Sequence, residues 1–207
     1  MSRCVIVSGA EIGDYVAIRK YLKNDDFIIF CDCGLRHQKE LGIKANLIVG
    51  DFDSYTRPDT ETDTIILPCE KDDTDTVYAV KEALSRGFED FLLIGVCGGR
   101  LDHTLGNVSI LLKLHSAGKS ALIVDDFSEM EIVSNEAKYI DNSFAYFSLI
   151  NIDGVCRGVY EKNAKFPLEN GEIDAEYQYG ISNEPLPGKT AEVCVKEGRA
   201  LLIKVRR

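Results

Sequence analysis

Short apolar runs alternate with segments of helical periodicity in the N-terminal part of the chain, and this alternation constrains the fold more than any other feature. We predict strands at 3–8, 27–31, 47–49, 64–67, 91–96 and 121–124, and helices between them at 11–23, 35–41, 73–86 and 102–117. Apolar strands that alternate with helices are typical of a parallel sheet with right-handed crossovers. The sequence therefore predicts a mostly parallel, Rossmann-like α/β domain over residues 1–127.

The pattern changes near residue 127. We predict no further helix of ordinary length, and the strand-like segments that follow are 130–133, 144–150, 173–177, 193–196 and 200–205. Asp153-Gly154, Asn170-Gly171 and Glu197-Gly198 are typical of turns, and the last of these pairs predicts a hairpin. We therefore predict an antiparallel β-sandwich over residues 128–207.

Charge and cysteine usage narrow the class of protein. A formal net charge of -10 argues against nucleic-acid binding through a basic face. No apolar run reaches the ~20 residues needed to span a bilayer, and the start of the chain lacks the pattern of a signal peptide. The seven cysteines are an odd number with no zinc-site spacing, which is typical of a reducing compartment. We predict a cytoplasmic protein with neither nucleic-acid nor membrane partners.

The segment Gly50-Asp51-Phe52-Asp53-Ser54 follows the predicted strand 47–49. If Asp51 and Asp53 are both extended, they place two carboxylates on one side of the chain at the edge of the sheet. Two close anions are costly unless a cation lies between them, and hard oxygen ligands suit Mg²⁺. A solvated turn is the competing interpretation, but the preceding strand favours a metal site.

A second acidic segment, Lys71-Asp72-Asp73-Thr74-Asp75-Thr76, opens the predicted helix 73–86. Thr74 and the acids also suit the N-terminus of any helix, where they cap and complement the dipole. That explanation leaves the lysine ahead of three acids unaccounted for. We interpret Lys71 as a ligand of a phosphate oxygen and Asp75 as a third metal ligand.

A third polar segment, from Gly98 to Asn107, follows the predicted strand 91–96. Its glycines permit close approach of a ligand, the helix N-terminus attracts anions, and Arg100 is a bidentate phosphate clamp. The competing interpretation is a loop followed by an ordinary helix that Asp102 caps. His103 lies four residues before Asn107, so the two share one face of this helix. All three segments follow strands, where open α/β sheets bind ligands. The predicted apolar face of this helix comprises Leu101, Leu105, Val108 and Leu112.

Taken together, these segments resemble the thiamine pyrophosphokinase family. The matching segments, in the family's order, are Asp32-Cys33-Gly34, Gly50–Ser54, Lys71–Asp75, Gly98–His103 with Asn107, and Gly180-Ile181-Ser182-Asn183-Glu184. The resemblance implies an α/β catalytic domain followed by a β-sandwich, in a homodimer whose active sites lie between subunits. It also implies Mg²⁺-dependent transfer of the pyrophosphoryl group of ATP to the hydroxyl of thiamine, giving thiamine diphosphate and AMP.

The resemblance assigns roles to individual residues. The implied catalytic residues are Asp51, Asp53, Asp75 and Asp102, of which the first three are the Mg²⁺ ligands. The implied residues for binding ATP and thiamine are Asp32, Lys71, Thr74, Arg100, His103, Asn107, Ser182 and Asn183, the last two on the thiamine side and in the partner subunit's site. The first motif departs from the family pattern, because Cys33 stands where the family usually has glycine. A positive φ at that position would strain a cysteine.

Two other functions are compatible with the same residues. A Mg²⁺-dependent nucleotide phosphohydrolase also uses acidic clusters at strand ends, although it has no need of a segment for a second organic substrate. A non-catalytic sensor of nucleotide or thiamine is the other alternative, although mere binding needs fewer charged groups. Residues 128–207 are compatible with dimerisation alone, and their pattern does not separate that role from thiamine binding.

Overall fold

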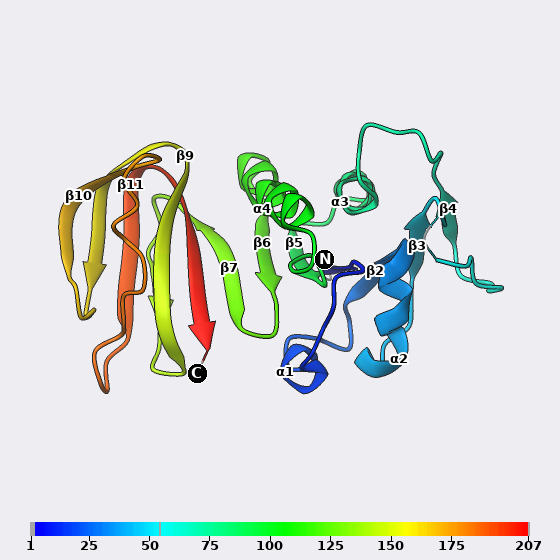
Figure 1. The fold of residues 1–207 in the computed structure, drawn as a ribbon, viewed down its shortest axis with the longest axis horizontal. Helices are drawn as coiled ribbons and strands as arrows, with labels where there is room; N and C mark the ends of the chain where they lie inside the picture. The colour runs from blue at the N-terminus through cyan, green and yellow to red at the C-terminus, as the bar shows by residue number, and fades with distance from the viewer. Residues whose placement is uncertain (1–2, 54, 207) are drawn as a thin grey trace. The chain divides into compact units, whose positions relative to one another are not determined.

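The computed structural model describes residues 3–53 and 55–206, so Ser54 of the second motif lies outside the described residues. The chain forms two compact units, residues 1–126 and 127–207 (Figure 1). Among the described residues, no helix is long and apolar enough to cross a membrane. The catalytic and thiamine-binding roles assigned to the two predicted domains stay predictions.

The N-terminal unit contains a parallel sheet with the strand order β6-β5-β1-β2-β3-β4. The strands are β1 (Cys4–Val7), β2 (Phe27–Cys31), β3 (Leu47–Gly50), β4 (Thr64–Ile66), β5 (Asp90–Ile94) and β6 (Ser120–Val124). The chain moves outward from β1 to β4 and then returns to β5 on the other side of β1. The carboxyl ends of β1 and β5 therefore form the kind of switch point at which open α/β sheets bind ligands.

Helices connect these parallel strands. They are α1 (Tyr15–Arg19), the 3₁₀ segment η1 (Asp32–His37), α2 (Gln38–Leu41), α3 (Asp75–Ser85) and α4 (Leu101–Ser116). Figure 1 shows α1 and α2 on one side of the sheet and α3 and α4 on the other. The helix predicted at 11–23 is much shorter, because the Asp14 side chain accepts a hydrogen bond from the Ala17 N–H and starts the helix there.

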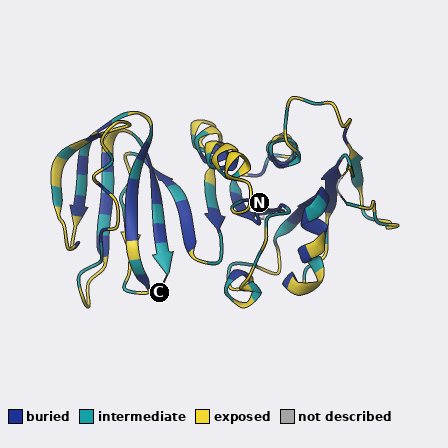
Figure 2. Cartoon of the chain, in the orientation of Figure 1, coloured by how far each residue is buried: buried dark blue, intermediate teal, exposed yellow. Residues whose placement is uncertain are grey.

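The central strands are buried on both faces, which explains their unbroken apolar sequences. All four residues of β1 are buried, as Figure 2 shows for most of this sheet. On one face, Val5 and Val7 belong to a core cluster with Ile18 of α1 and Leu41 of α2. Each such side chain contributes about 1.5–3 kcal/mol when it is fully buried.

The apolar face predicted for α4 is wrong. Leu101 and Leu105 are 71% and 62% exposed, whereas the buried residues of the helix are Asn107, Ile110, Leu111 and Leu114. Asp102 does not cap this helix, because Arg100 is the N-cap and Asp102 lies in the first turn. The sequence offers two apolar stripes at helical spacing, and periodicity alone did not select the stripe that packs on the sheet.

The C-terminal unit is an antiparallel sheet with the order β10-β9-β11-β7, and β8 pairs with the first residues of β11. Its strands are β7 (Ser128–Val133), β8 (Lys138–Ile140), β9 (Phe144–Lys162), β10 (Leu168–Asp174) and β11 (Ala191–Arg206). Alternate residues of the long strands, such as Phe147, Leu149, Val193 and Val195, are fully buried in one core cluster.

The turns predicted in this unit lie inside strands. Asp153-Gly154 is within β9, Asn170-Gly171 is within β10, and Glu197-Gly198, the predicted hairpin, is within β11. Gly198 has a φ of +92°, and the pairing register shifts across it, between Glu197 and Arg199. A glycine with positive φ occurs in β-bulges as well as in turns. Glu197-Gly198 does mark a change in backbone conformation, but its interpretation as a hairpin was wrong.

Candidate active site

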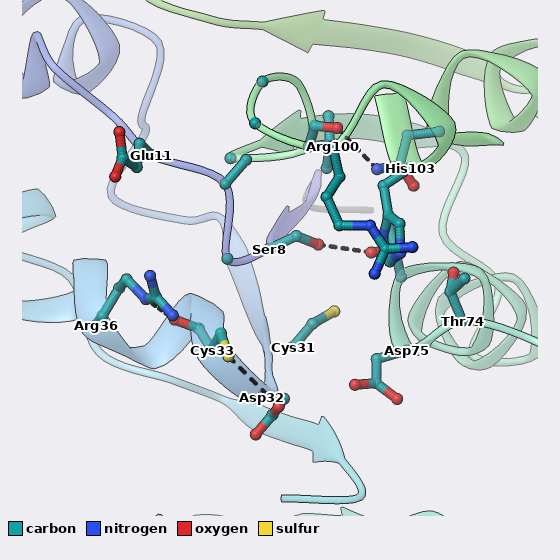
Figure 3. Close-up of a pocket in the computed structure, with 18 residues that line it drawn as sticks. Ser8, Glu11, Cys31, Asp32, Cys33, Arg36, Thr74, Asp75, Arg100 and His103 are labelled. Atoms are coloured by element: carbon teal, nitrogen blue, oxygen red, sulfur yellow. Dashed lines mark hydrogen bonds between the residues drawn. The ribbon is translucent and has the colours of Figure 1, made fainter. Parts of the chain in front are cut away.

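A cavity of about 480 Å³ lies at the carboxyl ends of β1, β2 and β5 in the N-terminal unit (Figure 3). Both α3 and α4 begin at this cavity, so their N-termini face it. Its lining residues are Ser8, Gly9, Ala10, Glu11, Cys31, Asp32, Cys33, Arg36, Thr74, Asp75, Thr76, Gly95, Val96, Gly98, Gly99, Arg100, His103 and Asn107.

Three carboxylates from different elements meet at this end of the sheet. Asp32 follows β2, Asp51 follows β3, and Asp75 is the first residue of α3; one oxygen of each lies within 4.8 Å of the others. Figure 3 shows the carboxylates of Asp32 and Asp75 in the same part of the cavity. Hard oxygen donors at this spacing suit an octahedral Mg²⁺ site, so the residues present fit such an ion.

Asp53 lies outside this three-carboxylate cluster. Phe52 has a φ of +56°, so the backbone between the two aspartates turns and does not run as a continuous extended strand. The backbone N–H of Asp53 donates to Asp51 Oδ1 at 3.3 Å, and Asp53 itself is exposed. The metal-binding role of Asp53 therefore stays a prediction, and the structure adds Asp32 as a third carboxylate.

Lys71 connects two members of the cluster. Its ammonium group forms ion pairs with Asp51 Oδ2 and, at 3.1 Å, with Asp75 Oδ1. The hydrogen bond from Lys71 lowers the pKa of Asp51, whereas burial raises the pKa of Asp75 although Lys71 opposes that shift. For Lys71, burial acts to lower the pKa, but its bonds to the two carboxylates outweigh burial and raise it. Lys71 is therefore held here as an ammonium ion.

The motif that carries Asp32 is tightly built. Asp32 has a φ of +27° and is 5% exposed, and the Cys33 thiol donates to its Oδ2 at 3.6 Å. Cys33 itself does not have a positive φ, so the cysteine is not strained in that way where the family usually has glycine. A Cβ on Gly50 would lie 2.9 Å from Asp32 Cβ, so the end of β3 also packs closely against Asp32.

The glycine-rich turn before α4 forms another part of the cavity. Gly98 and Gly99 have positive φ, and nothing lies within 4 Å of an added Cβ at either position. Arg100 is exposed, and its guanidinium donates to both oxygens of Asp102, at 3.1 and 2.5 Å. This pairing lowers the pKa of Asp102 to about 2, which makes it a weak general base at neutral pH. Asp102 does not line the cavity.

The remaining predicted residues of this unit line the cavity in different ways. Asn107 is buried, and its Nδ2 donates to the Val96 carbonyl at 2.8 Å, so it fixes the loop after β5. Thr74 is the N-cap of α3 and accepts from the Val77 N–H at 3.3 Å. His103 is exposed at the cavity wall.

The sequence reasoning missed the loop that follows β1. Ser8 and Glu11 of this loop line the cavity, as does Arg36 of η1, and Ser8 Oγ lies 2.7 Å from Thr76 Oγ1 of α3. The signal was available, because Ser8 ends the first predicted strand, Gly9 follows it, and the carboxyl-end rule applies to this strand as well.

Ser182 and Asn183 lie in the C-terminal unit, after β10. The Asn183 side chain is 4% exposed and is engaged within its own unit: Nδ2 donates to Glu161 Oε2 at 2.5 Å and to the Phe166 carbonyl at 2.8 Å. Ser182 is exposed with a φ of +60°, and its N–H donates to Ser148 Oγ at 3.0 Å. Asn183 therefore holds the loop in place, and Ser182 is exposed on it.

Comparisons with known proteins agree on one family. The family described as "Thiamin pyrophosphokinase, catalytic domain" matches residues 18–123, just over half of the chain. The thiamine pyrophosphokinase of Bacillus subtilis (strain 168) is 29% identical over 187 residues, covering 86% of this chain and 87% of that protein. The crystal structure of thiamin pyrophosphokinase from Geobacillus thermodenitrificans is 27% identical, covers 99% of this chain and 98% of its own, and has a TM-score of 0.84. The crystal structure of thiamine pyrophosphokinase from Bacillus subtilis, at 24% identity and 99% coverage of both chains, has a TM-score of 0.87 and shows the same fold.

Proposed function

Because this chain belongs to the thiamin pyrophosphokinase family, we propose that it transfers the pyrophosphoryl group of ATP to thiamine in the cavity of its N-terminal unit. The observation that carries the proposal is the meeting of Asp32, Asp51 and Asp75 beside a glycine-rich helix N-terminus. This arrangement combines a site for a divalent cation with a site for phosphate groups. The products are thiamine diphosphate and AMP.

Different residues of the chain would bind the metal ion and the phosphate groups. Asp32, Asp51 and Asp75 would hold Mg²⁺, which when bound neutralises phosphate charge and makes the β-phosphorus more electrophilic. Arg100 and the N–H groups at the start of α4 hold phosphate oxygens. Lys71, which pairs with Asp75, would bind a further phosphate oxygen. Asp53 is proposed as a further ligand from the family motif.

The chemistry is a displacement at the β-phosphorus. The thiamine hydroxyl oxygen forms a bond to that phosphorus, the bond from the phosphorus to the bridging oxygen of AMP breaks, and the hydroxyl proton is released to water. Such reactions depend mainly on in-line positioning and charge neutralisation, so rigid placement of the triphosphate matters more than a strong base. The rigid elements that supply this placement are the starts of α3 and α4.

The direct test is AMP formation from ATP and Mg²⁺ with and without thiamine, with the product identified by mass. We expect AMP and thiamine diphosphate to appear together only when thiamine is present, and removal of the cation with EDTA to stop both. Inorganic phosphate released without thiamine would favour a phosphohydrolase. Tight binding of both ligands without AMP would favour a sensor.

We further propose that the antiparallel unit closes as a β-sandwich and that two chains associate, so that Ser182 of one subunit serves thiamine in the other. The support is the match to the family segment and the exposure of Ser182. Light scattering on the purified protein measures the assembly, and a monomer that remains fully active would contradict it.

Ser182 supports a kinetic prediction. We expect Ser182→Ala to raise the KM for thiamine several-fold, by about 1 kcal/mol for one lost hydrogen bond, while the KM for ATP changes little. Serine already carries a Cβ at this positive φ, so alanine adds no backbone strain. Ser182→Gly, which removes the hydroxyl together with the Cβ, is the control. Equal changes in both KM values, or an effect of alanine that glycine does not share, would count against a thiamine contact by the hydroxyl.

A further inference from the structure

Lys71 lies at the position where a cation would interact with the acidic cluster. Its ammonium contacts Asp51 and Asp75, two of the three carboxylates that meet at the carboxyl end of the sheet. The three side chains are only 16%, 8% and 20% exposed, so water screens these contacts weakly. Two of the three carboxylates that would hold Mg²⁺ are therefore already engaged by a side chain of the same protein.

An ammonium ion and a divalent cation repel each other at such short range, and they use the same carboxylate lone pairs. Lysine has a flexible four-carbon stem and a head that accepts several geometries, so it can exchange one anionic partner for another. A phosphate group that enters the cavity offers such a partner.

We infer that Lys71 competes with the divalent cation for Asp51 and Asp75. The cation therefore binds together with the nucleotide, whose phosphates bind Lys71 and release the two carboxylates. This inference rests on the proposed function. It assigns Lys71 as a positioning residue that acts when the cation and the nucleotide bind. It explains why a lysine precedes the acids of the second motif, which the helix N-terminus alone does not. The free protein is thereby expected to bind a divalent cation weakly.

A nearby lysine provides a matched control. Lys81 pairs with Asp73, and both side chains are well exposed, at 48% and 34%. Neither residue belongs to the three-carboxylate cluster. Replacing Lys81 removes the same charge from the same part of the chain without freeing Asp51 or Asp75.

The test is a titration of the full-length protein with Mn²⁺ alone, followed by electron paramagnetic resonance of the free ion. We expect Lys71→Met to lower the Kd for Mn²⁺ by about tenfold or more, the equivalent of a partly buried ion pair, and Lys81→Met to leave it within about twofold. Equal affinity in the two variants would overturn the competition. If Lys71→Met does not fold, Lys71→Gln gives the same comparison.

A second arm separates this inference from the proposed function. Mn²⁺ binding is measured again with α,β-methylene-ATP, which cannot release AMP. If Mn²⁺ binds the wild type under neither condition, the proposed metal site fails and the inference fails with it. If Mn²⁺ binds in the presence of the nucleotide but the two variants have the same Kd for Mn²⁺ alone, the proposed metal site is retained. Only the inference that Lys71 competes for it is then wrong.

Discussion

Asp51→Asn is expected to fold normally and to lose turnover by about 10²–10³-fold or more, because it removes a charge from the group that neutralises the transferring phosphate. Asparagine has the same shape, so the loop after β3 is kept. The effect should fall on kcat more than on the KM for thiamine. The measurement is steady-state AMP formation, with circular dichroism to confirm the fold, and Asp25→Asn, at an exposed position away from the cluster, as the charge-matched control.

Asp53→Ala is the companion experiment, since the family motif assigns Asp53 to the metal and the structure leaves it outside the cluster. Because Asp53 is exposed, the variant is expected to fold like the wild type. We expect it to lose nearly all turnover. A variant that keeps the wild-type kcat would remove Asp53 from the metal shell and leave Asp32, Asp51 and Asp75 as the ligands.

Much of the N-terminal unit follows from local sequence. Strands such as β2 and β3 lie where apolar runs predict them, because a parallel strand that is buried on both faces consists almost entirely of apolar residues. The change of pattern near residue 127 also coincides with the division between the two units. Errors arise where one local signal serves two structures, as at Gly198, where a bulge and a turn need the same positive φ.

The segments that carry the site residues could be predicted from the sequence, but the distances between their side chains could not. The carboxyl-end rule brought the segments of Asp51 and Asp75 to one edge, but the distance between their side chains depends on packing. Asp32 joins them because η1 begins directly at the end of β2, and the sequence gives no periodic signal for a 3₁₀ segment. The ion pair of Lys71 likewise depends on the turn that ends at α3, which is irregular backbone.

Gly34→Ala is expected to destabilise the protein by at least about 2 kcal/mol, because a Cβ at this position has no room. It would lie 2.1 Å from the Val7 carbonyl oxygen and 2.8 Å from the Val7 carbonyl carbon, both in the backbone of the buried strand β1. Backbone atoms of a central strand cannot move aside as a flexible side chain can. The measurement is thermal unfolding, where a loss of this size lowers the Tm by about 4–8 °C.

Gly106→Ala is the matched control. Gly106 is inside α4, and nothing lies within 4 Å of an added Cβ, so alanine should raise stability by up to about 1 kcal/mol through helix propensity. The two substitutions add the same methyl group, and only its surroundings differ. A Gly34→Ala protein as stable as the wild type would show that η1 does not approach β1 as closely as described. It would also weaken the placement of Asp32, because that carboxylate is held beside Asp51 and Asp75 by the same short segment.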